Sequence, residues 1–324
     1  MRFPCLESLI NSSWYVFSDE PVESSPWYMP RLTHPAFLLP EESPDGLWHL
    51  FAHTWVGIQH YISTSGLTWE PQHIVFMRGH APCIFKEGQI YYLIYENHNR
   101  NYEYKKKRGE STKSRILISS STDLKLWSEP KVLLESEKIP YASHFSSSRL
   151  SRPQLVMWEG KYRLYFGASL MKLFDSREKT IVYLSYAEAE RIDGPYVVKE
   201  TPVLAPDLES NTNNLAVGSC KIIPCSDGLA TLSCSFYYDK TDNKSHSALF
   251  LLTSKNGDDW KVEKKIMDTP SSGWASGYLS SADCVFKADE NTWYCYFSAF
   301  EHKTNFFLYL EKESLGLLLG KVKA

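Results

Sequence analysis

The chain of 324 residues carries 35 lysines and arginines against 38 aspartates and glutamates, a net charge of −3 with histidine neutral. This near balance excludes binding of a polyanion through bulk charge, and no recognisable nucleic-acid module is present, so we expect no DNA or RNA partner. A chain of this length buries enough surface for a large core, which excludes disorder over most of it. Aromatic residues make up 14% of the chain, which favours β-structure over a helical bundle.

The N-terminal segment reads MRFPCLESLINSSWYVF and lacks the basic start, apolar stretch and small-residue cleavage site of a secretory signal. No window approaches 18 uninterrupted apolar residues. We therefore expect a cytoplasmic protein that does not bind membranes. The seven cysteines include no CxxC pair and no zinc-like spacing, so we expect them to be reduced and buried.

Short aromatic-rich runs, separated by Gly, Pro, Asn, Asp and Ser, recur along the chain and predict short strands joined by turns. They form a repeated unit of two facing runs followed by a third run that includes a turn, often with a tryptophan. In chain order the copies are HPAFLL, LWHLFAH and HYISTSGLTW; APCIF, IYYLIYE and ILISSSTDLKLW; RPQLVM, YRLYFGAS and IVYLSYAEAERIDGPY; SCKII, LSCSFYYD and ALFLLTSKNGDDW; and ADCVF, WYCYFSAF and FFLYLE.

Five copies of three or four antiparallel strands predict an all-β fold, a five-bladed β-propeller that forms one domain over residues 1–324. The alternative is an irregular β-sandwich or two small β domains. The blades are predicted at residues 31–77, 78–135, 148–205, 214–268 and 278–312, and residues 1–30 are predicted to pack on the ring or help to close it.

Several of these motifs resemble those of a known superfamily: the units STSGLTW, SSSTDLKLW and TSKNGDDW, the segment ERIDGPY and the strand pair APCIFKEGQIYYLIY. They resemble the five-bladed propeller glycoside hydrolases, which include arabinanases, family 43-like β-xylosidases and invertases. The resemblance spans about residues 30–310. It implies the fold and a role in carbohydrate metabolism, and it implies activity less directly because one fold hosts many functions.

The resemblance also implies three carboxylates at the axial end of the inner strands, which serve as base or nucleophile, as acid and as a group that tunes pKa. None stands at the matching positions. The Asp of a first-copy Asp-Pro motif is replaced by His34, and that of a second-copy Ala-Pro-Asp motif by Cys83. A Glu-Gly-Pro motif falls near Gly218 without its acid. The chain is therefore a non-hydrolytic relative, or its chemistry has moved to other residues.

Propeller topology predicts where such residues would gather. If each inner strand starts at the functional face, the second strand returns to that face and ends beside the start of the first. This places around one mouth the polar residues His34, His53, His80, Glu96, His98, Arg152, Asp239, Asp283 and Glu301.

Within this set we expect Asp283 and Glu96 to form a replacement carboxylate pair, with His34 near the lost base position. Asp283 is favoured because it opens the fifth inner strand, although it could instead accept bonds from backbone amides in a turn. Glu96 could instead form a salt bridge to Arg100 or Arg115.

The remaining members of the site are expected to contact the saccharide, through polar groups or by stacking on the apolar faces of sugar rings. They could also be structural histidines and tryptophans that pack between blades. They are His53, His80, Arg152, Glu301, Trp55 and Trp274. We expect no cofactor and no catalytic metal, because no two ligands lie at the short spacing of a zinc site. A structural ion on the propeller axis is the alternative.

The leading hypothesis is a glycoside-hydrolase-like enzyme that binds a saccharide at the propeller mouth and hydrolyses it with a non-standard acid/base set. The first alternative is a non-catalytic carbohydrate-binding propeller. The second is a phosphate-dependent glycoside phosphorylase, in which Arg152 and the cationic run Lys105–Arg108 would be central. That run could attract an acidic sugar or a phosphate, or it could be a solvated loop tip.

Overall fold

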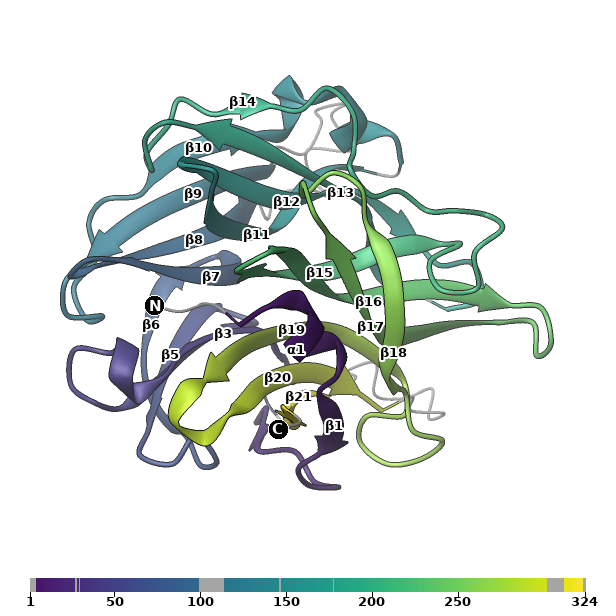
Figure 1. Ribbon diagram of the computed structural model, residues 1–324, viewed down its shortest axis with the longest axis horizontal. Helices are drawn as coiled ribbons and strands as arrows, with labels where there is room; N and C mark the ends of the chain where they lie inside the picture. The colour runs from purple at the N-terminus through teal and green to yellow at the C-terminus, as the bar shows by residue number, and fades with distance from the viewer. Residues whose placement is uncertain are drawn as a thin grey trace.

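The computed structural model describes residues 4–26, 28, 30–98, 114–145, 147–176, 178–301 and 312–322. The strands form five antiparallel sheets arranged around a common axis, so the molecule is a five-bladed β-propeller (Figure 1). The all-β class and the five-bladed architecture predicted from the repeats are both confirmed. Among the residues described, no helix has the length and apolar character needed to cross a membrane.

Each of the first four blades runs outward from the axis through four consecutive strands. The first blade holds β3 (Leu32–Leu38), β4 (Trp48–Thr54), β5 (Gly57–Ser63) and β6 (Glu70–Met77), and the second holds β7 (Gly79–Glu87), β8 (Ile90–His98), β9 (Ser114–Ser121) and β10 (Lys131–Glu135). The third holds β11 (Ser147–Trp158), β12 (Lys161–Lys172), β13 (Lys179–Ala189) and β14 (Val197–Val198), and the fourth holds β15 (Ala216–Cys225), β16 (Gly228–Asp239), β17 (Lys244–Ser254) and β18 (Lys261–Asp268). The fifth holds β19 (Tyr278–Lys287), β20 (Thr292–Phe300), β21 (Glu313–Lys321) and β1 (Ser13–Val16). The helices are α1 (Leu6–Ile10) and the 3₁₀ turns Pro40–Glu42, Ser136–Lys138, Pro140–Ser143 and Ala288–Glu290.

The fifth blade is built from both ends of the chain. Strand β1 pairs antiparallel with β21, and the two-residue strand β2 (Glu23–Ser24) pairs with β21 as well. The N-terminal strand therefore covers an edge that β21 would otherwise expose, and exposed edges invite aggregation. Leu9 of α1 is fully buried in the core cluster shared by the fourth and fifth blades, which anchors the segment that leads into β1.

The second strand of the first blade shows why the sequence contains apolar runs. All seven positions of β4 are buried. Alternate residues of a strand face opposite sides, so Leu50 packs in a cluster with Leu317 of the fifth blade, while Phe51 packs in a cluster with Leu93 of the second. Each such side chain contributes roughly 1.5–3 kcal/mol by leaving water. The aromatic excess of the sequence serves the same packing between blades.

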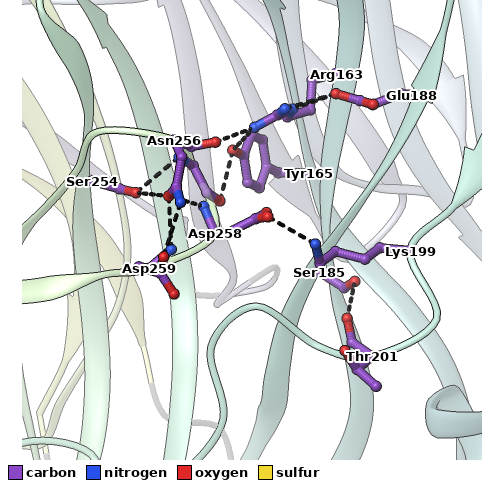
Figure 2. A network of polar contacts seen from close by, with 11 residues as sticks. Arg163, Tyr165, Ser185, Glu188, Lys199, Thr201, Ser254, Asn256, Asp258 and Asp259 are labelled. Carbon is purple, nitrogen blue, oxygen red and sulfur yellow. Dashed lines mark hydrogen bonds and ion pairs between the residues drawn. The ribbon is translucent and has the colours of Figure 1, made fainter.

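A polar network fills the space between the third and fourth blades (Figure 2). The guanidinium of Arg163 donates to Glu188 at 2.8 Å and to the carbonyl oxygen of Asn256 at 2.9 Å. Lys199 donates to Asp258 at 2.8 Å in the same region. These groups join the turn after β17 to the outer strands of the third blade.

Each innermost strand slips in register against its second strand near the same end of its blade. In four of the five slips a residue has positive φ: His34 (51°), Ala81 (46°), Arg152 (53°) and Gly218 (74°). This backbone is rare for residues with a side chain, and a following proline restricts the first three further. Bulges re-aim side chains and concentrate beside functional sites. One end of the ring is therefore the place to look for the site.

Candidate functional site at the propeller mouth

A cavity of about 510 Å³ opens at the end of the ring that carries the bulges. The first three blades and the fifth supply its walls, and no described residue of the fourth blade lines it. The register places the ends of the second strands beside the starts of the first: Thr33 pairs with His53, and His80 pairs with Glu96. This is the arrangement that topology predicted.

The sequence assigns nine residues to catalysis or to saccharide contact, and six of these nine line this cavity. They are His34, His53, Trp55, His80, Glu96 and Arg152. They come from three blades, and the longest separation between them, from His34 to Arg152, is closed by a direct hydrogen bond. The ring therefore gathers groups that are remote in sequence.

Glu96 is the carboxylate at the base of this group, and its side chain is fully buried. One oxygen forms an ion pair with Arg149, and the other accepts a hydrogen bond from the hydroxyl of Ser151 at 2.5 Å. Both contacts favour the ionised carboxylate. Arg115, one of the partners expected from the sequence, instead pairs with Glu135 at 3.5 Å.

The His34 ring is oriented by Arg152, whose Nε donates to His34 Nε2 at 3.0 Å. Because a guanidinium only donates, His34 Nε2 accepts, and the neutral ring carries its proton on Nδ1. Burial, followed by the charge of Arg152, lowers the pKa of His34 well below its usual range. His34 is therefore a neutral hydrogen-bond donor at neutral pH.

His53 and His80 form a second pair, with 2.5 Å between His53 Nε2 and His80 Nδ1. Burial, followed by the charge of His80, holds the pKa of His53 well below its usual range. In a neutral pair one of the two joined nitrogens donates and the other accepts. Of the two outer nitrogens, His53 Nδ1 and His80 Nε2, one then carries a lone pair and the other an N–H, whichever tautomer is present. The pair can therefore accept a proton at one end and release another at the other end.

The structure does not bring Asp283 to this cavity. Strand β19 begins at Tyr278, so Asp283 lies in the middle of the strand, below the bulge, and not at its start. Its carboxylate forms an ion pair with Lys221 and accepts a hydrogen bond from the backbone N–H of Phe37 at 2.9 Å. Although burial opposes the charged amine, the Asp283 carboxylate raises the pKa of Lys221. The placement of Asp283 at the mouth was wrong because the strand start was set too late.

Glu301 and Trp274 also do not line the cavity. Glu301 follows β20 and is exposed. Trp274 stacks on Phe297, with 5.6 Å between ring centroids, and its indole N–H donates to the carbonyl oxygen of Asp19 at 3.0 Å. Its ring is therefore used in packing. The run Lys105–Arg108 and the side chain of His98 lie outside the described residues.

Sequence reasoning missed several groups that line the cavity, chiefly Arg31, Arg149, Ser151, Glu178, Lys179 and Glu313. One signal was available, because Arg149 and Ser151 are two residues apart and a strand sends such residues to one face, here toward Glu96. Glu313 comes from the third strand of the last blade, and only the closed ring brings it near Arg31, at 2.9 Å.

The fourth blade carries no acid at its bulge, where Val217 and Gly218 stand. A Cβ at Gly218 would lie 2.0 Å from the carbonyl oxygen of Cys234, so this position admits only glycine. The preceding Val217 is fully buried and packs in an apolar cluster. Within the described ranges, no three or more His, Cys, Asp or Glu side chains are arranged to hold a metal ion.

No protein-family model matches the chain, and no curated protein matches it. Solved structures do match its fold. The family 117 glycoside hydrolase Zg3597 of the marine bacterium Zobellia galactanivorans is 13% identical over 97% of this chain and 92% of its own, with a TM-score of 0.58. The catalytic domain of the GH62 α-L-arabinofuranosidase of Coprinopsis cinerea is 13% identical over 96% of this chain and 98% of its own, with a TM-score of 0.65.

An N-acetylgalactosamine deacetylase from F. plautii is similar to the same extent, with 14% identity over 96% of this chain and 95% of its own and a TM-score of 0.60. The predicted resemblance to propeller glycoside hydrolases is thus confirmed as a likeness of fold. Because the matches include a deacetylase, this fold carries more than one chemistry on sugars. The function must be argued from the cavity itself.

Proposed function

We propose that the protein is a glycoside-hydrolase-like enzyme that binds a saccharide in the mouth cavity and cleaves a glycosidic bond with a set built from Glu96 and histidines. The observation that carries this proposal is that Glu96, His34 and the His53–His80 pair line one cavity of about 510 Å³. The saccharide complexes and activities named for matched structures support a sugar as the ligand. Asp283 is left out of the proposed set because it does not line the cavity and its carboxylate is paired with Lys221 below it.

Glycosidic cleavage passes through an oxocarbenium-like transition state, which needs a nearby anion and a proton for the leaving oxygen. In the proposed mechanism Glu96 supplies the anion, since Arg149 and Ser151 hold its carboxylate ionised and fixed. The His53–His80 pair supplies the proton. Its N–H end protonates the leaving oxygen while its lone-pair end takes a proton from the attacking water, so charge and protons balance.

The test is release of reducing ends from a panel of neutral and acidic oligosaccharides. Glu96→Gln should lower turnover by roughly 10²–10⁴-fold, while Glu96→Asp, which keeps the charge, should retain part of it. Circular dichroism checks that each variant is folded. Unchanged turnover in the folded Glu96→Gln variant would show that Glu96 is not the catalytic anion.

A non-catalytic carbohydrate-binding propeller is the second candidate, favoured by the engagement of both Glu96 oxygens in protein contacts. It predicts saturable binding in calorimetry with no reducing ends released over long incubation. The phosphorylase hypothesis is tested in the same assay, because it requires cleavage to depend on added inorganic phosphate.

A further inference from the structure

The charged groups of the cavity are not evenly matched. Arg31 pairs with Glu313 at 2.9 Å, and Arg149 pairs with Glu96. Arg152 differs from both: in the part of the chain that the structure describes, no carboxylate lies within ion-pair distance of its guanidinium. Its one hydrogen-bond acceptor among the same residues is the neutral ring of His34. Within the described part of the chain, the positive charge of Arg152 therefore has no carboxylate paired with it.

Unused donors accompany this unmatched charge. Among the described residues, neither Arg152 Nη1 nor His34 Nδ1 has a hydrogen-bond partner, and both atoms are buried. The Nδ1 atom of His53 is also buried and without a partner among these residues, and it is an N–H or a lone pair according to the tautomer of the His53–His80 pair. Leaving a buried donor without an acceptor is unfavourable, and more so when the donor is charged. The protein therefore leaves hydrogen-bonding capacity of Arg152 unused beside the cavity that this residue lines.

The backbone fixes this arrangement before any ligand arrives. Arg152 and His34 occupy equivalent bulges of two blades, each with positive φ and each followed by proline. The N–H of His34 also donates to the hydroxyl of Ser281 at 3.0 Å, which ties this bulge to the fifth blade. A guanidinium that is held in place before binding loses less freedom when it binds an acceptor.

We propose that Arg152, oriented by its hydrogen bond to His34, forms a subsite for an oxyanion group carried by the saccharide itself, a carboxylate or a sulfate. A sugar hydroxyl could accept one hydrogen bond but would leave the charge of Arg152 unmatched, whereas an oxyanion accepts from the guanidinium and balances its charge as well. This inference rests on the proposed function only in taking the ligand to be a saccharide. A free inorganic anion has the same chemistry, and the experiment separates the two sources.

The experiment is isothermal calorimetry on the full chain with matched pairs of probes: galacturonate and galactose oligomers, a sulfated and an unsulfated galactose oligomer, and inorganic phosphate alone. We expect an acidic oligomer to bind at least about tenfold tighter than its neutral counterpart, the least that a charged hydrogen bond contributes. Arg152→Gln should remove this preference by weakening the binding of the acidic oligomer much more than that of the neutral one, and Arg152→Lys should restore part of it. Arg191→Gln, which removes an exposed arginine paired with Asp193 in the same blade, is the matched control and should change nothing.

Equal affinity for acidic and neutral probes would overturn the proposal, as would an Arg152→Gln variant that loses both alike. Tight phosphate binding through Arg152 without a preference for acidic sugars would also overturn it, and would assign the subsite to a free anion. A second readout guards against misfolding: because Arg152→Gln removes an unmatched charge, its melting temperature should not fall. The subsite and the catalytic proposal fail separately, because Arg152-dependent binding without cleavage contradicts only the latter.

Discussion

Two arginines of the third blade, Arg163 on β12 and Arg152 on β11, show how differently the same side chain is used. Arg163 donates to Glu188 through Nε at 2.8 Å and through Nη2 at 2.7 Å, and its Nη1 reaches the Asn256 carbonyl oxygen. Its guanidinium also lies 4.3 Å from the centre of the Tyr186 ring (Figure 2 shows the polar contacts). Each nitrogen of this guanidinium is therefore engaged by the protein.

Among the described residues, Arg152 has one neutral acceptor and no carboxylate partner. The comparison separates two kinds of charged group. Arg163 and the Lys221–Asp283 pair are matched by other protein groups and join parts of the ring. The mouth holds matched arginines as well, but Arg152 is left for a ligand to pair, as is expected where a ligand binds.

The largest expected effect comes from breaking the matched side of the comparison. Arg163→Ala should lower the free energy of unfolding by about 3–5 kcal/mol, because it leaves the Glu188 carboxylate and a backbone carbonyl oxygen without their donor. Arg152→Ala should lower it by less than about 1 kcal/mol. Urea denaturation measures both. Equal losses in the two variants would remove the distinction between matched and unmatched arginines.

The inner-strand ion pair should behave like Arg163. Asp283→Asn should destabilise the fold by about 3 kcal/mol, since it leaves Lys221 charged and unpaired, and the double change Asp283→Leu with Lys221→Met should recover most of the loss. Chemical denaturation checks the stability, and saccharide affinity at the mouth should be unchanged in the double variant. Loss of turnover in a stable double variant would return Asp283 to a role in the reaction.

Acid should weaken the protein through its buried histidines. Burial lowers the pKa values of His34 and His53 well below 6.5 and that of His60 to about 3, so the unfolded chain binds protons that the folded chain does not. Stability is then complete above about pH 6.5 and falls below it, by up to about 1.4 kcal/mol per pH unit for each histidine.

Denaturation at pH 7, 6 and 5 measures this slope. His60→Gln should flatten it by one histidine's share, because His60 lies outside the mouth, 2.9 Å from His49, and its removal leaves the cavity intact. A stability that stays constant from pH 7 to 5 would contradict the assignment of neutral histidines.

The smallest effect is expected at the rim. Trp55 is 44% exposed and lines the cavity, so Trp55→Ala should change stability by less than about 0.5 kcal/mol. It should weaken saccharide binding by roughly 0.5–1.5 kcal/mol if its ring stacks on the sugar. Trp274→Ala is the contrasting variant: it removes packing on Phe297 and should lower stability without changing affinity. If Trp274→Ala weakened saccharide binding while Trp55→Ala lowered stability alone, the roles assigned to the two rings would have to be exchanged.

Much of the mouth could be predicted from the sequence because strand topology is periodic. Once five repeats are recognised, the end of β8 must return beside the start of β7, which places Glu96 against His80. The same reasoning failed for Asp283. The apolar run ADCVF marks the predicted start of the inner strand, whereas β19 begins at Tyr278 and includes two serine residues before that run. An error of a few residues along an inner strand moves a side chain from the mouth to the interior.

The sequence by itself determined the five-bladed ring and the end of it at which His34, His53, His80, Glu96 and Arg152 meet, since repeat count and strand alternation are local properties. Only the tertiary structure decided which charges are matched. Arg149 pairs with Glu96 of the neighbouring blade, and Lys221 pairs with Asp283. Among the described residues, Arg152 contacts only a neutral imidazole. Such pairing depends on distances of a few ångströms between separate blades, because charge interactions in a buried setting change steeply with separation and burial.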